Sequence, residues 1–164
     1  MGYTHYWKFK KTSENINDYD KLFEKSVKDA EKCIARIPRI IPKKSFRKVK
    51  TRYGEEWEQY EDGKTNFAIF GWDGTGSPVF TSEKISFNGD ASVGNDHETF
   101  YIEKYDDGFN FCKTARKPYD VAVCVALLCF AHNFGDVFEY HSDGNIAKGE
   151  EGWGLAKKIV ESYY

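Results

Sequence analysis

The sequence lacks the features that define several broad protein classes. Its 24 Lys and Arg residues do not outnumber its 26 Asp and Glu residues, so it has no overall basic excess of the kind that marks nucleic-acid-binding domains. The N-terminal segment MGYTHYWKFKK lacks the apolar region of a signal peptide. The longest apolar stretch, 121–131, is shorter than the roughly 20 residues of a membrane-spanning helix. We therefore expect a soluble, cytoplasmic protein that binds neither membrane nor nucleic acid.

Cysteine is scarce as well, and its spacing fits neither a zinc site nor a disulfide framework. No two of the four cysteines form a CxxC pair, and most of them lie in apolar patterns. They are Cys33, Cys112, Cys124 and Cys129. We expect reduced, buried thiols that act as small hydrophobic side chains, and we expect no metal or cofactor.

What the sequence does contain is enough apolar and aromatic bulk for one folded domain. Of its 164 residues, 40% are hydrophobic and 17% are aromatic. Alternation over 3–9 predicts a strand with Tyr3, His5 and Trp7 on one face. Apolar residues spaced three and four apart predict helices over about 17–37 and 150–164. A third helix is predicted from Pro118, at its first position, to just before Gly135.

Short strand patterns fill the rest of the chain. They occur at 65–72, 84–90, 97–105, 109–114 and 137–142. The segments 97–105 and 109–114 flank the turn sequence DDG and are expected to form a β-hairpin. The predicted fold is therefore a single α+β domain over residues 1–164, in which about three helices pack on a mostly antiparallel sheet.

Two adjacent blocks carry opposite charge. Residues 43–52 contain six basic residues and no acid, and residues 53–62 contain five acids and no base. We expect a hairpin near 39–64 with ion pairs between its strands. A disordered insertion is the alternative, which the aromatic residues of the segment disfavour. Such a hairpin is also a candidate protein-interaction surface, and a homo-oligomer stays open.

The clearest functional signal is a cluster of cations where the third helix is predicted to begin. A lysine at position 117 cannot cap a helix, because its side chain accepts no hydrogen bond. Together with Lys113 and Arg116 it also brings positive charge to the positive helix end, at a cost of about 0.3–1 kcal/mol per charge. Either Asp120 pairs with Arg116 or Lys117, or an external anion binds the free amides and the cations.

A histidine triplet suggests an alternative chemistry. His97 and Thr99 form an H-x-T sequence, which two-histidine phosphodiesterases use in pairs to hold and protonate a phosphate. The other three histidines lack Ser or Thr two positions later, so the second triplet is missing. An ordinary hydrogen-bonding histidine at the start of a strand explains His97 equally simply.

Several motifs spread over most of the chain, namely MGYTHYW, GWDGTGSP, ISFNG, DHETF, FNFCKTARKPYD and SDG. Taken together they resemble a family of small phage and bacterial proteins that has no assigned activity. The segment 38–64 is longer than the family pattern, which implies that the charge blocks are an insertion. A phage setting implies a candidate role in counter-defence, in which the protein captures a nucleotide immune messenger in the host cytoplasm.

The leading hypothesis is a non-catalytic protein that binds a phosphorylated, nucleotide-like small molecule. Basic and aromatic side chains near the third helix would hold the phosphate and stack on the base. The candidate residues are Tyr3, His5, Trp7, His97, Phe111, Lys113, Thr114, Arg116, Lys117, Tyr119 and Asp120. The alternative is a hydrolase that cleaves a phosphodiester or glycosidic bond of a nucleotide, with His97 as acid and base and Thr99 beside it.

Overall fold

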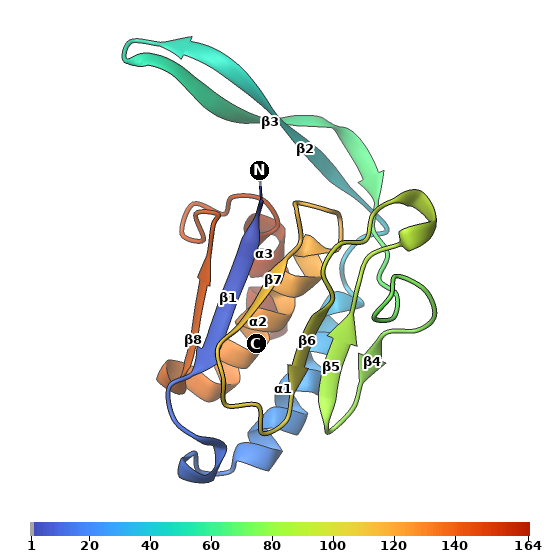
Figure 1. The fold of residues 1–164 in the computed structure, drawn as a ribbon, viewed down its shortest axis with the longest axis vertical. Helices are drawn as coiled ribbons and strands as arrows, with labels where there is room; N and C mark the ends of the chain where they lie inside the picture. The colour runs from blue at the N-terminus through green and yellow to red at the C-terminus, as the bar shows by residue number, and fades with distance from the viewer. Residues whose placement is uncertain (1) are drawn as a thin grey trace.

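The computed structural model describes residues 2–164, which form the α+β fold that the sequence predicts (Figure 1). The described residues contain three α-helices: Tyr19–Ile34 (α1), Asp120–Phe134 (α2) and Trp153–Tyr163 (α3). Helix α2 packs against both of the others. All three lie behind the strands in the view of Figure 1. The predicted number of helices is confirmed.

The described strands form three small antiparallel sheets instead of one larger sheet. In the first sheet, β1 lies between β7 and β8, and in the third, β5 lies between β4 and β6. The second sheet is the β2–β3 hairpin. The strands are Thr4–Phe9 (β1), Ile40–Thr51 (β2), Gly54–Asn66 (β3), Val79–Phe80 (β4), Lys84–Phe87 (β5), Phe100–Glu103 (β6), Asn110–Lys113 (β7) and Phe138–Ser142 (β8).

Two strand predictions are wrong. The residues that follow β3 form no further strand up to 72, and only Phe70 makes an isolated bridge, to Asn88. Strands β6 and β7 do not form a hairpin, because β6 pairs with β5 and β7 pairs with β1. Local alternation identifies a strand but not its partner. Here the partner of β7 lies at the start of the chain, beyond the reach of any local pattern.

Helix α2 is the centre of the core. Its residues 121–127 are all buried. The 18-residue segment Asp120–Val137 is long and apolar enough to cross a membrane, but most of it is buried, as expected for the core helix of a soluble protein. Trp7 and Phe9 of β1 pack over this core, and Tyr3, just before β1, and His5 are buried on the same face, as the predicted alternation requires. All four cysteines are free and buried.

The predicted charged hairpin is formed, and it projects from the rest of the molecule (Figure 1). We call this hairpin, residues 40–66, the arm. Its strands pair antiparallel, with a register shift between Pro42 and Lys44. Arg47 and Glu58 lie opposite each other and form an ion pair of 3.0 Å. The base of the arm reaches back to the ends of α2 and α3 and helps to form the candidate site.

Candidate anion-binding site

A cavity of about 680 Å³ lies where the base of the arm meets the N-terminal ends of α2 and α3. Its walls come from both strands of the arm, from the loop between β7 and α2, and from the first turns of the two helices. Six cationic and three acidic side chains line it. They are Lys43, Lys44, Lys64, Arg116, Lys117 and Lys158, with Glu61, Asp120 and Glu151. The cavity is therefore locally basic, although the whole chain has a net charge of −2.

The structure corrects the predicted start of α2. The helix begins at Asp120, with Tyr119 as its N-cap residue, and not at Pro118. Before it, the Lys117 amide donates to the Thr114 carbonyl and the Asp120 amide donates to the Lys117 carbonyl. The Asp120 amide is therefore not available to a ligand, contrary to expectation. Tyr119 makes no side-chain capping bond, so the helix end does lack a conventional cap.

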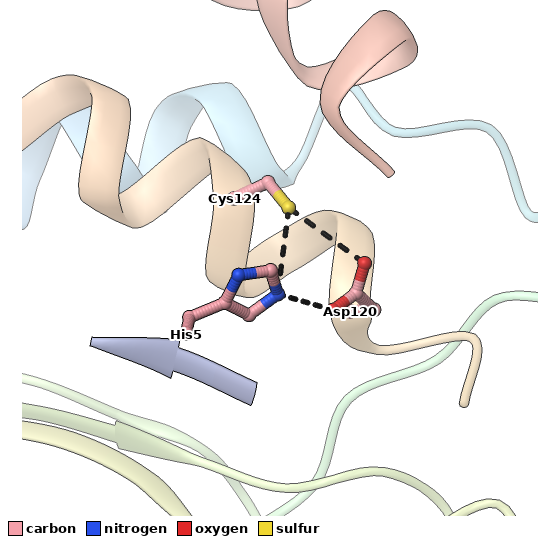
Figure 2. A group of neighbouring side chains, drawn as sticks. All are labelled: His5, Asp120 and Cys124. Atoms are coloured by element: carbon pink, nitrogen blue, oxygen red, sulfur yellow. Dashed lines mark hydrogen bonds and ion pairs between the residues drawn. The ribbon is translucent and has the colours of Figure 1, made fainter. Parts of the chain in front are cut away.

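Asp120 holds this end of the helix through a buried network (Figure 2). Nε2 of His5 donates to Asp120 Oδ1 over 2.5 Å, and the Thr114 hydroxyl donates to the same oxygen over 2.6 Å. Burial opposes ionisation of Asp120, but His5 and Thr114 together keep its pKa below the ordinary value. The expectation that Asp120 pairs with Arg116 or Lys117 is therefore wrong.

Cys124 completes a group that has the composition of a metal site. Its Sγ atom lies 3.9 Å from His5 Nε2 and 3.7 Å from Asp120 Oδ2. The three ligand atoms lie within 4.8 Å of one another. However, the contact between His5 and Asp120 is a hydrogen bond, and burial with the neighbouring Asp120 charge raises the pKa of Cys124 and keeps the thiol protonated. We interpret the group as a structural network that fixes the first turn of α2.

Arg116 faces the cavity in a constrained position. Its Nε atom donates to Glu151 Oε1 over 2.9 Å. Its guanidinium group lies between two aromatic rings, 4.7 Å from the centre of Tyr3 and 4.6 Å from that of Phe46. Burial raises the pKa of Glu151, and Arg116 opposes that shift. Arg116 is therefore already paired with a carboxylate, although with Glu151 and not with Asp120.

The backbone at Arg116 is strained. Ala115 has φ of 50° and Arg116 has φ of 60°, so two successive residues other than glycine adopt the left-handed conformation. Such residues are uncommon and concentrate at functional sites. The amides of Thr114 and Ala115 both donate to the carbonyl of Tyr3, which holds this conformation in place.

The remaining lysines of the cavity are less engaged than Arg116. Among residues 2–164, the side chains of Lys43, Lys64, Lys117 and Lys158 form no ion pair within 4.0 Å. Two of the three acids, by contrast, are already bound, Asp120 by His5 and Glu151 by Arg116. The free charge at the cavity is therefore mainly positive.

Gly152 allows the two helix ends to approach each other. A Cβ atom at this position would lie 2.8 Å from Asp120 Oδ2 and 3.0 Å from Val121 Cα. The residue itself has ordinary helical backbone angles, with φ of −70°. Glycine is therefore required here by the close approach of α3 to α2, which brings the positive ends of both helix dipoles to one cavity.

Only some of the candidate residues meet at this site. Arg116, Lys117 and Asp120 line the cavity, and Tyr3, His5 and Thr114 lie just behind them. The others are placed elsewhere. Trp7 is in the core, Tyr119 is buried with its hydroxyl on the Glu98 carbonyl, and Phe111 is exposed on β7 outside the cavity lining. The Lys113 side chain lies near Gly2 and is likewise outside the lining of the cavity.

His97 and Thr99 also lie outside the cavity lining. The Nδ1 atom of His97 donates to the Lys113 carbonyl over 2.7 Å, and the Thr99 hydroxyl donates to the Trp72 carbonyl. Both side chains therefore make ordinary hydrogen bonds to the backbone. This arrangement agrees with the simpler of the two interpretations of the H-x-T triplet.

The sequence pattern identifies only three of the nine charged side chains of the cavity, Arg116, Lys117 and Asp120. The other six lie in segments for which it predicts only the arm and an amphipathic helix; they are Lys43, Lys44, Glu61, Lys64, Glu151 and Lys158. One signal was available, since Gly149, Gly152 and Gly154 flank the start of α3 and glycines often mark close approach.

Comparison of the chain with protein-family models, with curated proteins and with solved structures finds no match. The resemblance to the phage and bacterial family therefore stays a prediction.

Proposed function

We propose that this protein binds a phosphorylated, nucleotide-like small molecule in the cavity between the arm and the N-terminal ends of α2 and α3. The observation that carries the proposal is the set of four lysines, Lys43, Lys64, Lys117 and Lys158, that come from three separate segments and converge without ion-pair partners. Phosphate groups are the common biological ligands of such a cluster at helix N-terminal ends.

The size and the walls of the cavity support a small ligand. At about 680 Å³ it falls within the range of typical small-molecule sites, about 300–1,000 Å³. Phe46, whose ring contacts the Arg116 guanidinium group at the cavity, is 37% exposed, so part of this side chain remains accessible to the base of a ligand. The strained backbone at Ala115 and Arg116 supports the same location.

Binding without catalysis is the better-supported form of the proposal. No histidine lines the cavity among residues 2–164, and its two most buried carboxylates are already bound, Asp120 by His5 and Glu151 by Arg116. The hydrolase alternative relied on His97, whose Nδ1 and neighbouring Thr99 hydroxyl are bound to backbone carbonyls outside the cavity. A sequestering protein in the cytoplasm, for example one that removes a signalling nucleotide, is the role that this proposal implies.

The experiment is a screen of cyclic dinucleotides, cyclic trinucleotides and ADP-ribose derivatives by thermal shift, followed by heat release and chromatography of the bound compound. Release of intact ligand supports a binder, and release of an altered ligand contradicts it and supports the hydrolase. The absence of a shift with every compound contradicts both.

A matched pair of variants then locates the site. Lys158→Ala removes a cavity lysine, whereas Lys157→Ala removes its neighbour on α3, which does not line the cavity. We expect only the first variant to weaken binding. Equal affinities for the two variants would move the site elsewhere.

A further inference from the structure

The arm is longer and more exposed than the cavity requires. Its strands have 12 and 13 residues, and only its base approaches the body of the protein (Figure 1). The contacts there include Lys44 Nζ with the Glu151 carbonyl and Phe46 with Arg116. An isolated two-stranded hairpin is marginally stable in water. The outer part of the arm therefore lacks the packing that usually stabilises a sheet of this length.

Large aromatic side chains stand exposed on this outer part. Tyr53, at the tip, is 87% exposed and Trp57 is 61% exposed. The only partner described for the Trp57 ring is Lys48, whose Nζ lies 5.4 Å from the ring centre. Exposed Trp and Tyr residues are enriched among the energetically dominant residues of protein interfaces. These residues indicate a surface that binds another protein chain.

The distribution of charge on the arm indicates which protein chain would bind there. Strand β2 carries the basic block and β3 the acidic block, so the arm has one positive and one negative edge along its length. Only Arg47–Glu58 and Lys48–Glu55 form ion pairs between the two strands, and these four side chains are 47–59% exposed. A partner of a single charge would match one strand and be repelled by the other.

A second copy of the arm matches both strands. When two arms stack face to face about a two-fold axis parallel to their strands, the basic strand of each copy lies over the acidic strand of the other. An axis that runs across the strands would instead place β2 over β2 and β3 over β3, so that like charges face each other. We call the side of the arm that carries Trp57 the tryptophan face. Because side chains alternate along a strand, Lys48, Lys50 and Glu55 share this face with Trp57.

We propose that the protein forms a two-fold dimer through the tryptophan faces of two arms. In this dimer, Trp57 of each copy lies at the centre of the interface against Lys48 of the other copy, and Lys50 of each β2 lies over Glu55 of the opposite β3. The proposal does not depend on the identity of the ligand in the cavity.

Sedimentation equilibrium of the unliganded full chain over a range of concentrations tests the proposal. We expect a species of twice the 19.0 kDa chain mass, with an affinity that falls as salt increases, because the charges are exposed. Trp57→Ala should weaken the dimer by at least about 30-fold. Trp72→Ala is the matched control, because Trp72 is 72% exposed and lies outside the arm. A monomer at every concentration, or equal effects of the two variants, would overturn the proposal.

Charge exchange tests the pairing of the strands directly. An acidic-arm variant carries Lys48→Glu and Lys50→Glu, and a basic-arm variant carries Glu55→Lys and Gln59→Lys. Each variant alone should be monomeric, because β2 of one copy would then lie over a β3 of like charge in the other copy. A 1:1 mixture of the two should form a heterodimer, which also shows that both arms remain folded. A mixture that stays monomeric, or single variants that dimerise like the wild type, would contradict the two-fold arrangement.

Discussion

Replacement of Gly152 by Ala gives a sharp test of how the two helix ends are packed. The residue has helical backbone angles, so alanine introduces no backbone strain. Here the new methyl group would lie 2.8 Å from Asp120 Oδ2 and 3.0 Å from Val121 Cα, well inside normal contact distance.

Neither neighbour can move easily. The Asp120 carboxylate is held by His5 and Thr114, and Val121 belongs to the backbone of the core helix. Relief therefore requires α3 to move away from α2, and overpacking of this kind costs about 1–3 kcal/mol. We expect Gly152→Ala to lower the free energy of unfolding in urea by about that amount. The same displacement should weaken any ligand that contacts both helix ends.

Gly108→Ala is the control for this measurement. Gly108 lies in a loop with φ outside the left-handed region, and the nearest atom to its added Cβ would be Asp106 Oδ1, at 3.4 Å. We expect a change in stability within about 0.5 kcal/mol for this variant. If Gly152→Ala were as stable as the wild type, the close approach of α2 and α3 would not exist as described, and the cavity would lose one of its walls.

Three further predictions follow from individual side chains. Lys117→Ala should weaken phosphate-ligand binding, measured by calorimetry, by about 1–3 kcal/mol while leaving the unfolding free energy nearly unchanged. Arg116→Ala should lower that free energy, because it leaves the partly buried Glu151 without its cation. Burial alone would raise the pKa of Asp29, but hydrogen bonds from Lys25 and three other side chains outweigh it and lower this pKa from 3.8 to about 2. Because the folded state therefore resists protonation of Asp29, the free energy of unfolding should fall by about 2 kcal/mol between pH 4 and pH 2. Asp29→Asn should remove that part of the acid dependence in urea titrations.

The sequence predicted the fold class because its local patterns were strong. The alternation of β1, the apolar run of α2 and the opposite charge blocks of the arm each identify one element without reference to the rest of the chain. The sheet partners could not be predicted in this way. Strand β7 has the same pattern whether it pairs with β6 or with β1, and its partner β1 lies at the other end of a long stretch of sequence that no local pattern spans.

The start of α2 shows the same limit at the level of one residue. Pro118 is a typical first residue of a helix, yet the helix begins two residues later. The deciding contact is the bond from His5 to Asp120, which joins positions 115 residues apart in the sequence. It turns the Asp120 carboxylate inward and fixes that residue as the first of the helix. No local rule could identify a histidine at the start of the chain as the partner.

Arg116 and Lys117, two of the three cations that the sequence places before α2, line the cavity, but the charge of Arg116 is balanced in neither of the two expected ways. The sequence left Asp120 or an outside anion as the partner of these cations. In the structure, Asp120 accepts bonds from His5 and Thr114, and Glu151 neutralises Arg116. In the proposed site, the unpaired positive charge comes from Lys117 together with lysines of the arm and of α3. An anion would therefore bind through long, exposed lysine side chains more than through the helix end, so its affinity should fall steeply as salt increases.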